Sequence, residues 1–442
     1  MTNLVGKIVK KQGMAIGTGV HFGYDVGQGA ASGRGLVVGS GVAVVVVRLS
    51  WKGNSMEQRN ISRRAFLRNT SLAAAGAFAA SVKAEECDSS KASKSADTSK
   101  ILNYNEKMGY RRLGKTNLMV SEVSLGGHWK NREAGRYWGS FANDEVPPDV
   151  AKNRTEVISA CIDVGINYLD ITTPAECLAY GAALKGRRDK MYVGADDYTL
   201  CPRSDKRCNV KDQSFNVEEC LRRLQTDYLD IWRPQAKMDG KNTDEHVAVM
   251  IETFQKLHKQ GKVRHLGISS HCRPWFEHVI ETFGEFEMII FPCSAKTKEK
   301  GQAPTKENIE EVNPGHGADQ TQGIFAKVRE RDIGVVTIKP FFGGSLFVES
   351  IGKVKFPVMG VGSKNENDLA RLTLQCIIAN NAITATVPGL STVYEVENAA
   401  RASYTRHLAM TAADQEWLME ITDRQWAALP QEYRWLHDWE FV

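Results

Sequence analysis

Acidic residues follow two of the apolar, β-rich segments of this chain. Asp170 lies at the end of segment 167–171, and Asp196 and Asp197 come directly after segment 191–195. Carboxylates that share one site raise one another's pKa unless a cation lies between them. Such a group supports acid–base catalysis, or it binds a divalent cation with His271 as a further ligand. Whether these side chains act together depends on the elements that carry them.

Short β-rich segments alternate with amphipathic helical segments from Tyr110 onward. The expected strands are 120–125, 167–171, 191–195, 228–232, 263–268, 288–291, 334–338 and 385–387. The expected helices are 154–164, 176–184, 216–224, 244–259, 274–283, 322–331, 366–379 and 394–402. Eight strand–helix units predict an α/β fold, a (β/α)8 TIM barrel, in which function lies on the loops at the carboxyl ends of the strands.

Two local patterns add detail to this barrel. The segment that starts at Tyr110 predicts an N-terminal hairpin, with its turn at Lys115–Asn117, that closes the bottom of the barrel. Asn216, followed three residues later by Glu219, predicts a capping box at the start of the expected helix 216–224.

Several segments, in chain order, are similar to one known family of barrel enzymes. They are YRRLGKT (110–116) with VSEVSLGG (120–127), GINYLD (165–170), ALKGRRDK (183–190), YLDIW (228–232), GKVRHLGISS (261–270) and VPG (387–389) with Glu397–Asn398. Together they resemble the aldo-keto reductase family over about residues 109–405. The resemblance implies hydride transfer between a nicotinamide and a carbonyl. In the family a tyrosine is the acid, a lysine pairs with an aspartate, and a histidine orients the substrate.

This chain keeps one of those four catalytic residue types. Asp170 matches the aspartate, whereas Ala175 stands where the tyrosine is expected. Asp196 and Asp197 replace the lysine, and Pro234–Gln235 replaces the histidine. The candidate catalytic residues are therefore Asp170, Asp197, Gln235 and His128, with Lys237, His271, Tyr180 and Tyr198 as further substitutes.

The resemblance also implies a cofactor, NADP or NAD. The residues expected to bind it are Ser269, Ser270, Lys339, Gly389, Glu397 and Asn398. Cys293 stands where a ring-stacking tyrosine is usual, and Ser391–Thr392 where a basic residue usually binds the 2′-phosphate. No metal ligand is assigned for the leading hypothesis, and the lack of a Cys-x-x-Cys pair argues against an iron–sulfur or zinc site built from thiolates.

The N-terminal residues predict export. Residues 1–55 are expected to be untranslated or disordered, and 85–107 form a flexible linker. Between them, 56–84 contain SRRAFL (62–67), a short apolar run and small residues, which is the order of a twin-arginine signal peptide. We therefore expect a periplasmic or otherwise exported protein that meets the export machinery. In an oxidising compartment, Cys201 and Cys208 are candidates for a disulfide.

The remaining features limit the function. A formal net charge of +5, with basic and acidic residues interleaved, does not indicate nucleic-acid binding. No apolar run is long enough for a membrane span. Residues 406–442 are expected to form a helix and an aromatic tail that packs on the barrel. The leading hypothesis is an oxidoreductase that acts on a small carbonyl compound, such as a sugar. The alternatives are a noncatalytic sugar-binding barrel and a metal-assisted hydrolase, lyase or isomerase.

Overall fold

The computed structural model describes residues 98–129, 141–299, 323–351, 354–357 and 364–442, which all belong to one unit of the chain. Its centre is a parallel sheet of eight strands: β3 (Leu125–Gly126), β4 (Tyr168–Ile171), β5 (Tyr192–Ala195), β6 (Leu229–Trp232), β7 (Val263–Ser269), β8 (Met288–Pro292), β9 (Gly334–Ile338) and β12 (Ala385–Thr386). Parallel bridges Val123↔Thr386 and Gly126↔Gly389 join the first strand to the last. The sheet is therefore closed, and the expected (β/α)8 barrel is confirmed.

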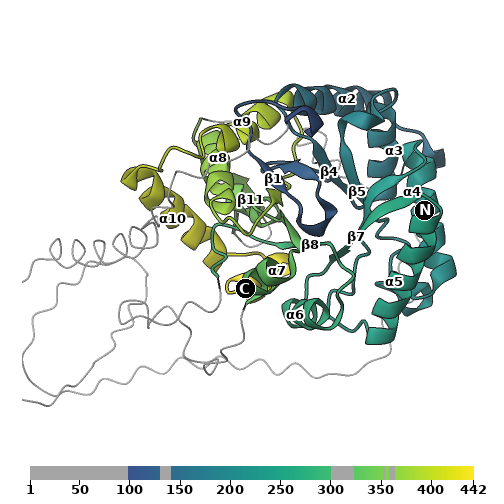
Figure 1. Ribbon diagram of the computed structural model, residues 1–442. Coiled ribbons are helices and arrows are strands. Elements are labelled where there is room, and N and C mark those ends of the chain that lie inside the picture. The colour runs from purple at the N-terminus through teal and green to yellow at the C-terminus, as the bar shows by residue number, and fades with distance from the viewer. Residues whose placement is uncertain (1–97, 130–140, 300–322, 352–353, 358–363) are drawn as a thin grey trace, which may run out of the picture. The chain divides into compact units, whose positions relative to one another are not determined.

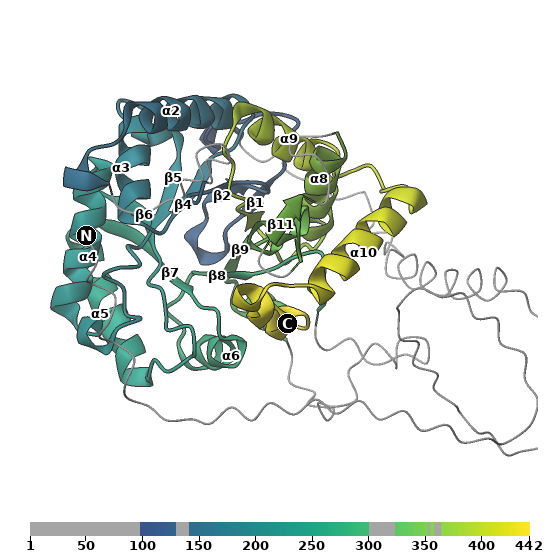
Figure 2. The same ribbon diagram turned by 180° about the vertical axis from the view of Figure 1, so that it is seen from behind.

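Helices surround these strands (Figures 1 and 2). They are α2 (Pro148–Asp163), α3 (Pro174–Ala183), α4 (Val210–Leu224), α5 (Asp244–Lys259), α6 (Arg273–Thr282), α7 (Ile324–Arg331), α8 (Lys364–Ile378) and α9 (Val393–Tyr404). Each packs an apolar stripe on the barrel; in α4 the buried residues Val217, Cys220, Leu221 and Leu224 recur at helical spacing. Such burial, summed over the ring, is the main source of the stability of the fold.

The start of α4 differs from the expectation. The helix begins at Val210, and the N-cap is Asn209, whose side chain accepts from Asp212 N at 2.9 Å. Asn216 is instead buried within the helix, where its Nδ2 donates to Asp196 Oδ1 at 3.0 Å. The predicted capping box is wrong, because the same polar side chain serves a strand end across the helix–sheet interface.

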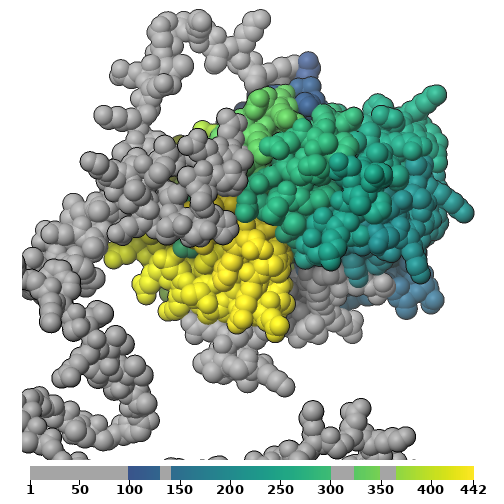
Figure 3. All heavy atoms as spheres, turned by 90° about the horizontal axis from the view of Figure 1, so that it is seen from below, coloured from purple at the N-terminus to yellow at the C-terminus, as the bar shows by residue number. Residues whose placement is uncertain are grey.

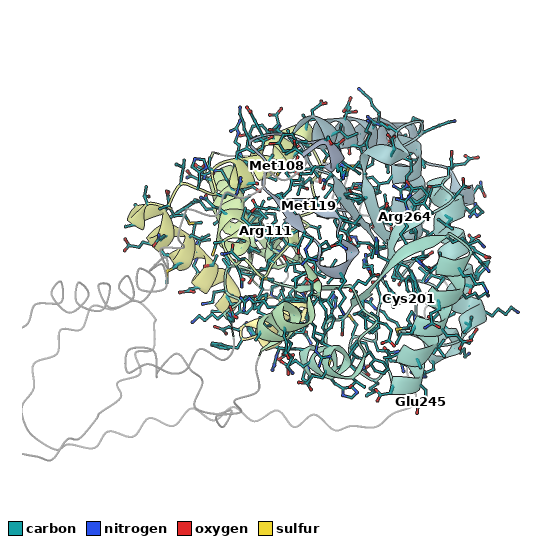
Figure 4. The ribbon with its side chains drawn as sticks, viewed as in Figure 1. Met108, Arg111, Met119, Cys201, Glu245 and Arg264 are labelled. Carbon is teal, nitrogen blue, oxygen red and sulfur yellow. The ribbon has the colours of Figure 1, made fainter. Side chains whose placement is uncertain are left out.

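The N-terminal hairpin is present, as expected. Strands β1 (Tyr110–Arg112) and β2 (Met119–Ser121) pair antiparallel around a 3-10 turn at Gly114–Thr116. Arg111, labelled in Figure 4, donates to the carbonyls of Ile378 and Ile383 at 2.6 and 2.5 Å. The hairpin is thereby fixed to the end of α8 and to the segment before β12.

The ordered part begins before the expected barrel boundary at residue 108. Ile101 is buried, and Asn103 Nδ2 donates to Ile166 O and Lys190 O at 3.1 and 2.7 Å. Residues 98–107, the end of the expected linker, therefore pack on the barrel. The segments expected to be untranslated, signal peptide or linker between residues 1 and 97 lie outside the described residues.

Three further elements follow β9. An antiparallel hairpin, β10 (Val348–Ile351) and β11 (Val354–Pro357), precedes α8 and was not expected from the sequence. Helix α10 (Ala412–Ala427) and the 3-10 segment η7 (Gln431–Trp439) form the C-terminal extension. Among the described residues, no helix is both long and apolar enough to cross a membrane.

Candidate active site

A buried ion pair joins the carboxyl ends of β4 and β6. Arg233 Nε and Nη2 donate to Asp170 Oδ1 and Oδ2 at 2.5 and 2.6 Å, and Nη2 also donates to Ile171 O at 2.7 Å. Burial raises the pKa of Asp170, and Arg233 opposes that rise. Desolvation lowers the pKa of Arg233, but Asp170 outweighs it, so that the net shift is upward. Arg233 is thus the cation that a carboxylate in this position requires.

A histidine–carboxylate pair lies near this ion pair, where β4 ends and α3 begins. His128, which follows β3, has its Nδ1 2.6 Å from Glu176 Oε1 and 2.9 Å from Thr172 Oγ1. The Glu176 side chain is fully buried, whereas 30% of the His128 side chain is exposed. A carboxylate beside Nδ1 orients the imidazole, so that Nε2 can take up and release a proton.

Two small residues make room for the His128–Glu176 pair. A Cβ atom on Gly127 would lie 2.6 Å from Glu176 Oε2 and 2.5 Å from Asp170 O. Ala175 is buried in the first turn of α3, directly before Glu176. Thr173 caps this helix, and its side chain accepts from Glu176 N at 3.1 Å. The helix start therefore presents a carboxylate to His128 and no phenol.

The two aspartates after β5 do not form a set with Asp170. Asp196 is buried and accepts hydrogen bonds from Asn216 Nδ2, Trp232 Nε1 and Gln235 N at 3.0–3.1 Å. Burial raises the pKa of Asp196 to about 7, against the effect of Arg233 and these donors. Asp197 faces α4, where its Oδ2 accepts from Arg223 Nη1 at 2.8 Å. Because separate partners satisfy these carboxylates, they do not offer an open set of cation ligands.

The other predicted catalytic substitutes have different surroundings. Gln235 Nε2 donates to Asp196 O at 3.2 Å, and Lys237 Nζ pairs with Asp205. Tyr180 is buried, with its hydroxyl between Arg154 and Gly127 O, and burial raises its pKa to about 12. Tyr198 is 39% exposed, and its backbone N–H donates to Thr172 O at 2.9 Å. Of the predicted residues, the structure brings Asp170 and His128 to the carboxyl end of β4: Asp170 lies in the strand, and His128 contacts Thr172 directly after it.

The residues expected to hold a cofactor lie at the ends of β7, β9 and β12. Ser269 and Ser270 are buried, and Ser270 Oγ accepts from Cys272 N at 3.0 Å. Lys339 follows β9 with a φ of 61°. A Cβ on Gly389 would lie 2.2 Å from His128 O, so this position admits only glycine. On α9, Glu397 is exposed, while Asn398 Nδ2 donates to Asn367 O of α8 at 2.8 Å.

The last residues, 430–442, cross this end of the barrel, and we refer to them as the C-terminal strap. Figure 3 shows the C-terminal part of the chain, in yellow, packed against the green and teal elements. Trp439 stacks on Phe291 of β8 (5.2 Å between centroids) and donates from Nε1 to His271 O at 3.0 Å. Trp435 stacks on the ring of His271 at 4.3 Å. Backbone bonds join Lys298 to Glu440 and Val442.

The strap fills the space above β8 and β9. Leu436 and Trp439 of the strap, with Trp426 of α10, lie around Cys293 and Lys339. Burial raises the pKa of the Cys293 thiol to about 12. His271 lies beneath Trp435, and its burial, together with nearby Lys339, holds its pKa well below the usual value. An aromatic tail that packs on the barrel was expected, and its position over these strands is decided by the structure.

A comparison of the sequence with models of protein families identifies the family of this chain. The family model described as "Aldo/keto reductase family" matches residues 138–411. The chain belongs to the aldo/keto reductase family.

The individual relatives have low sequence identity to this chain. L-galactose dehydrogenase of Arabidopsis thaliana is 26% identical over 342 residues, which cover 71% of this chain and 93% of the relative. The 6-dehydroglucose reductase of Agrobacterium fabrum is 23% identical over 278 residues, covering 59% and 84%. An aldo/keto reductase from Klebsiella pneumoniae, solved in complex with NADP and acetate, is 17% identical, with a TM-score of 0.48 over 73% of this chain and 96% of that one.

The C-terminal strap covers part of the surface expected to hold the cofactor of the family. Aldo/keto reductases use NAD(P)H, in agreement with the cofactor expected from the sequence. The side chains of Ser269, Ser270 and Lys339 are at the ends of their strands. Leu436 and Trp439 of the strap lie against Cys293 and Lys339. The strap therefore lies beside Lys339, one of the residues expected to bind the nucleotide.

Two residues of the site were not singled out from the sequence. Arg233 and Glu176 lie just after expected strands of the barrel, but no sequence pattern indicated which side chains they would contact. The available signal was a charged residue at the end of each apolar segment, since a buried charge needs a counter-charge. Only the closed barrel shows that Asp170 provides it for Arg233, and that Glu176 faces His128.

Proposed function

We propose that this aldo/keto reductase is an oxidoreductase in which His128, oriented by Glu176, replaces the tyrosine as the proton-transfer group. The 2.6 Å contact between His128 Nδ1 and Glu176 Oε1 is the observation that supports it. The exposed part of the imidazole exchanges a proton with the substrate oxygen: it donates when a carbonyl is reduced and accepts when an alcohol is oxidised. The Asp170–Arg233 pair keeps the loop 170–172 in place through the bond to Ile171 O.

The substrate that we propose is a sugar or a related polyhydroxy carbonyl compound. The names of two relatives, L-galactose dehydrogenase and 6-dehydroglucose reductase, support this class. The nicotinamide nucleotide would bind on the side of β7, β9 and β12, at Ser269, Ser270 and Lys339 and, on α9, Glu397 and Asn398. It would supply or accept the hydride. Because the strap lies over part of that surface, we propose that nucleotide binding requires the strap to leave it.

Shortening the chain after Leu429 is expected to tighten binding of NADPH or NADH by about tenfold or more, because the binding-competent form no longer competes with the docked strap. Isothermal titration of the full chain and the shortened chain measures this. Trp439→Ala in the full chain tests the same step without deleting residues, and Trp417→Ala on α10 is the control. Equal affinities would contradict the role of the strap. If no variant bound either nucleotide, the barrel would be a noncatalytic one, and sugar titration would follow.

We also propose that the protein is exported through the twin-arginine route to the periplasm. The paired arginines Arg63 and Arg64, followed by a short apolar run and small residues, support this. The double variant Arg63→Lys/Arg64→Lys is expected to leave the protein in the cytoplasm with its N-terminal segment uncleaved. Cell fractionation with intact-mass measurement decides this, and an unchanged distribution would overturn the proposal.

A further inference from the structure

Three side chains of different metal-binding type converge at the carboxyl end of the barrel, away from Asp170 and His128. They are Asp205, Cys208 and His246, and one ligand atom of each lies within 4.8 Å of those of the other two. Asp205 and Cys208 belong to the loop between β5 and α4, and His246 lies in the first turn of α5. Figure 4 labels Cys201 of the same loop and Glu245 of the same helical turn.

Local structure fixes this convergence. A single 3-10 turn, Asp205–Arg207, places Asp205 and Cys208 together, and Cys208 N donates to Asp205 O at 3.1 Å. His246 is the third residue of α5, whose N-cap is Thr243. Its Nε2 lies 4.0 Å from Asp205 Oδ1. The three ligands thus come from the loop between β5 and α4 and from the first turn of α5, at the end of the barrel where this fold places its functional sites.

The groups around the three residues define the charge of the site. Lys237 Nζ pairs with Asp205, and Asn242 Nδ2 lies 3.8 Å from Cys208 Sγ. Burial raises the pKa of Cys208, Asp205 raises it further, and Lys237 opposes them. A divalent cation in the place of the ammonium group would favour the thiolate.

We propose that Asp205, Cys208 and His246 bind zinc(II), or a divalent cation of similar ligand preference, with the fourth coordination position open. A carboxylate, a thiolate and an imidazole together suit zinc and do not suit magnesium or calcium. On binding, the Cys208 thiol releases its proton to solvent and Lys237 Nζ leaves Asp205. When His246 binds through Nε2, Nδ1 carries the ring proton, so it no longer accepts from Thr243 N, now at 3.3 Å. The bond from His246 N to Thr243 Oγ1 still caps the helix.

This site was not visible in the sequence. Its ligands are spread over residues 205–246 and include only one cysteine, so the search for paired cysteines does not find them. The candidate disulfide between Cys201 and Cys208 is also relevant here. The structure has both as free thiols, with Cys201 Sγ donating to Tyr198 O and Cys208 Sγ to Pro202 O at 3.1 and 3.4 Å. Cys208 is thus available as a ligand.

Cobalt(II) serves as the spectroscopic probe, in a titration of the full chain under reducing conditions. We expect one equivalent to give a thiolate-to-cobalt absorption band, which zinc(II) then removes by displacement. Cys208→Ser and His246→Gln should abolish the band, while Cys201→Ser, which changes the other cysteine of the loop, should retain it. Lys237→Met should tighten cobalt binding about five- to tenfold, because the competing ion pair is removed.

Several results would overturn the proposal. They are the absence of a thiolate band in the wild-type chain, its persistence in Cys208→Ser, or its loss in Cys201→Ser while Cys208→Ser retains it. Far-UV circular dichroism of each variant separates loss of a ligand from loss of folding. The test does not involve nucleotide or turnover, so its outcome is independent of the proposed oxidoreductase activity.

Discussion

Arg233→Met is expected to lower the free energy of unfolding by about 3–5 kcal/mol, because it leaves the buried carboxylate of Asp170 without its counter-charge. Both side chains are almost fully buried, with exposures of 1% for Arg233 and 5% for Asp170. The substitution also removes the bond from Arg233 Nη2 to Ile171 O. Urea unfolding followed by tryptophan fluorescence measures the loss.

The double variant Asp170→Leu/Arg233→Met separates the pair from its parts. Because it removes both charges, it is expected to be more stable than Arg233→Met alone. Arg264→Met is the matched control: Arg264, labelled in Figure 4, pairs with Asp230 at 2.9 Å but is 51% exposed. Its loss should lower the stability by about 1 kcal/mol or less. Equal effects of Arg233→Met and Arg264→Met would show that the buried pair has no special role.

His128→Ala is expected to lower the turnover number by about 10²- to 10⁴-fold, the range typical for loss of an acid–base group. The KM for the substrate should change much less, because the imidazole acts on the proton and not on the bulk of the substrate. Steady-state rates with an aldose or its lactone, measured across pH, test this.

Glu176→Gln distinguishes a polarised imidazole from a merely positioned one. The amide keeps the shape of the side chain but not its charge, so the turnover number should fall with little change in KM if the charge of Glu176 acts on the imidazole. The His265–Glu287 pair is the control, with a comparable contact of 3.1 Å near the start of β7, far along the strand from its carboxyl end. A wild-type rate in His128→Ala, or an equal loss in His265→Ala, would refute the assignment.

The sequence was sufficient for the elements whose patterns are local. α5 begins at Asp244 and ends at Lys259, as its apolar spacing and flanking residues predicted. β9 (Gly334–Ile338) also has the expected bounds, because a short β-branched run between two charged segments has few alternatives. α4 was expected too late, since Asn216 fits a cap as well as a buried hydrogen-bond donor. Local pattern does not distinguish these two uses of one side chain.

The candidate site required more than the pattern. Asp170 and His128 were expected at strand ends, and the structure places them there. Asp197, also expected as catalytic, has the polar surroundings of an ion pair with Arg223 on α4. The direction in which a carboxylate on a loop points depends on the helix that packs beside the loop. The position of that helix is fixed only when the barrel is closed.

By itself, the sequence determined that the chain is an eight-stranded barrel, because periodicity and motif spacing are properties of short segments. Only the tertiary structure decided which charges meet. Asp170 finds Arg233 across 63 residues, and Glu176 finds His128 across 48. The strap meets strands that precede it by more than 100 residues. Burial determines these partners. A charge or an aromatic ring that is removed from water needs a complementary group nearby, and only the closed barrel shows which residue provides that group.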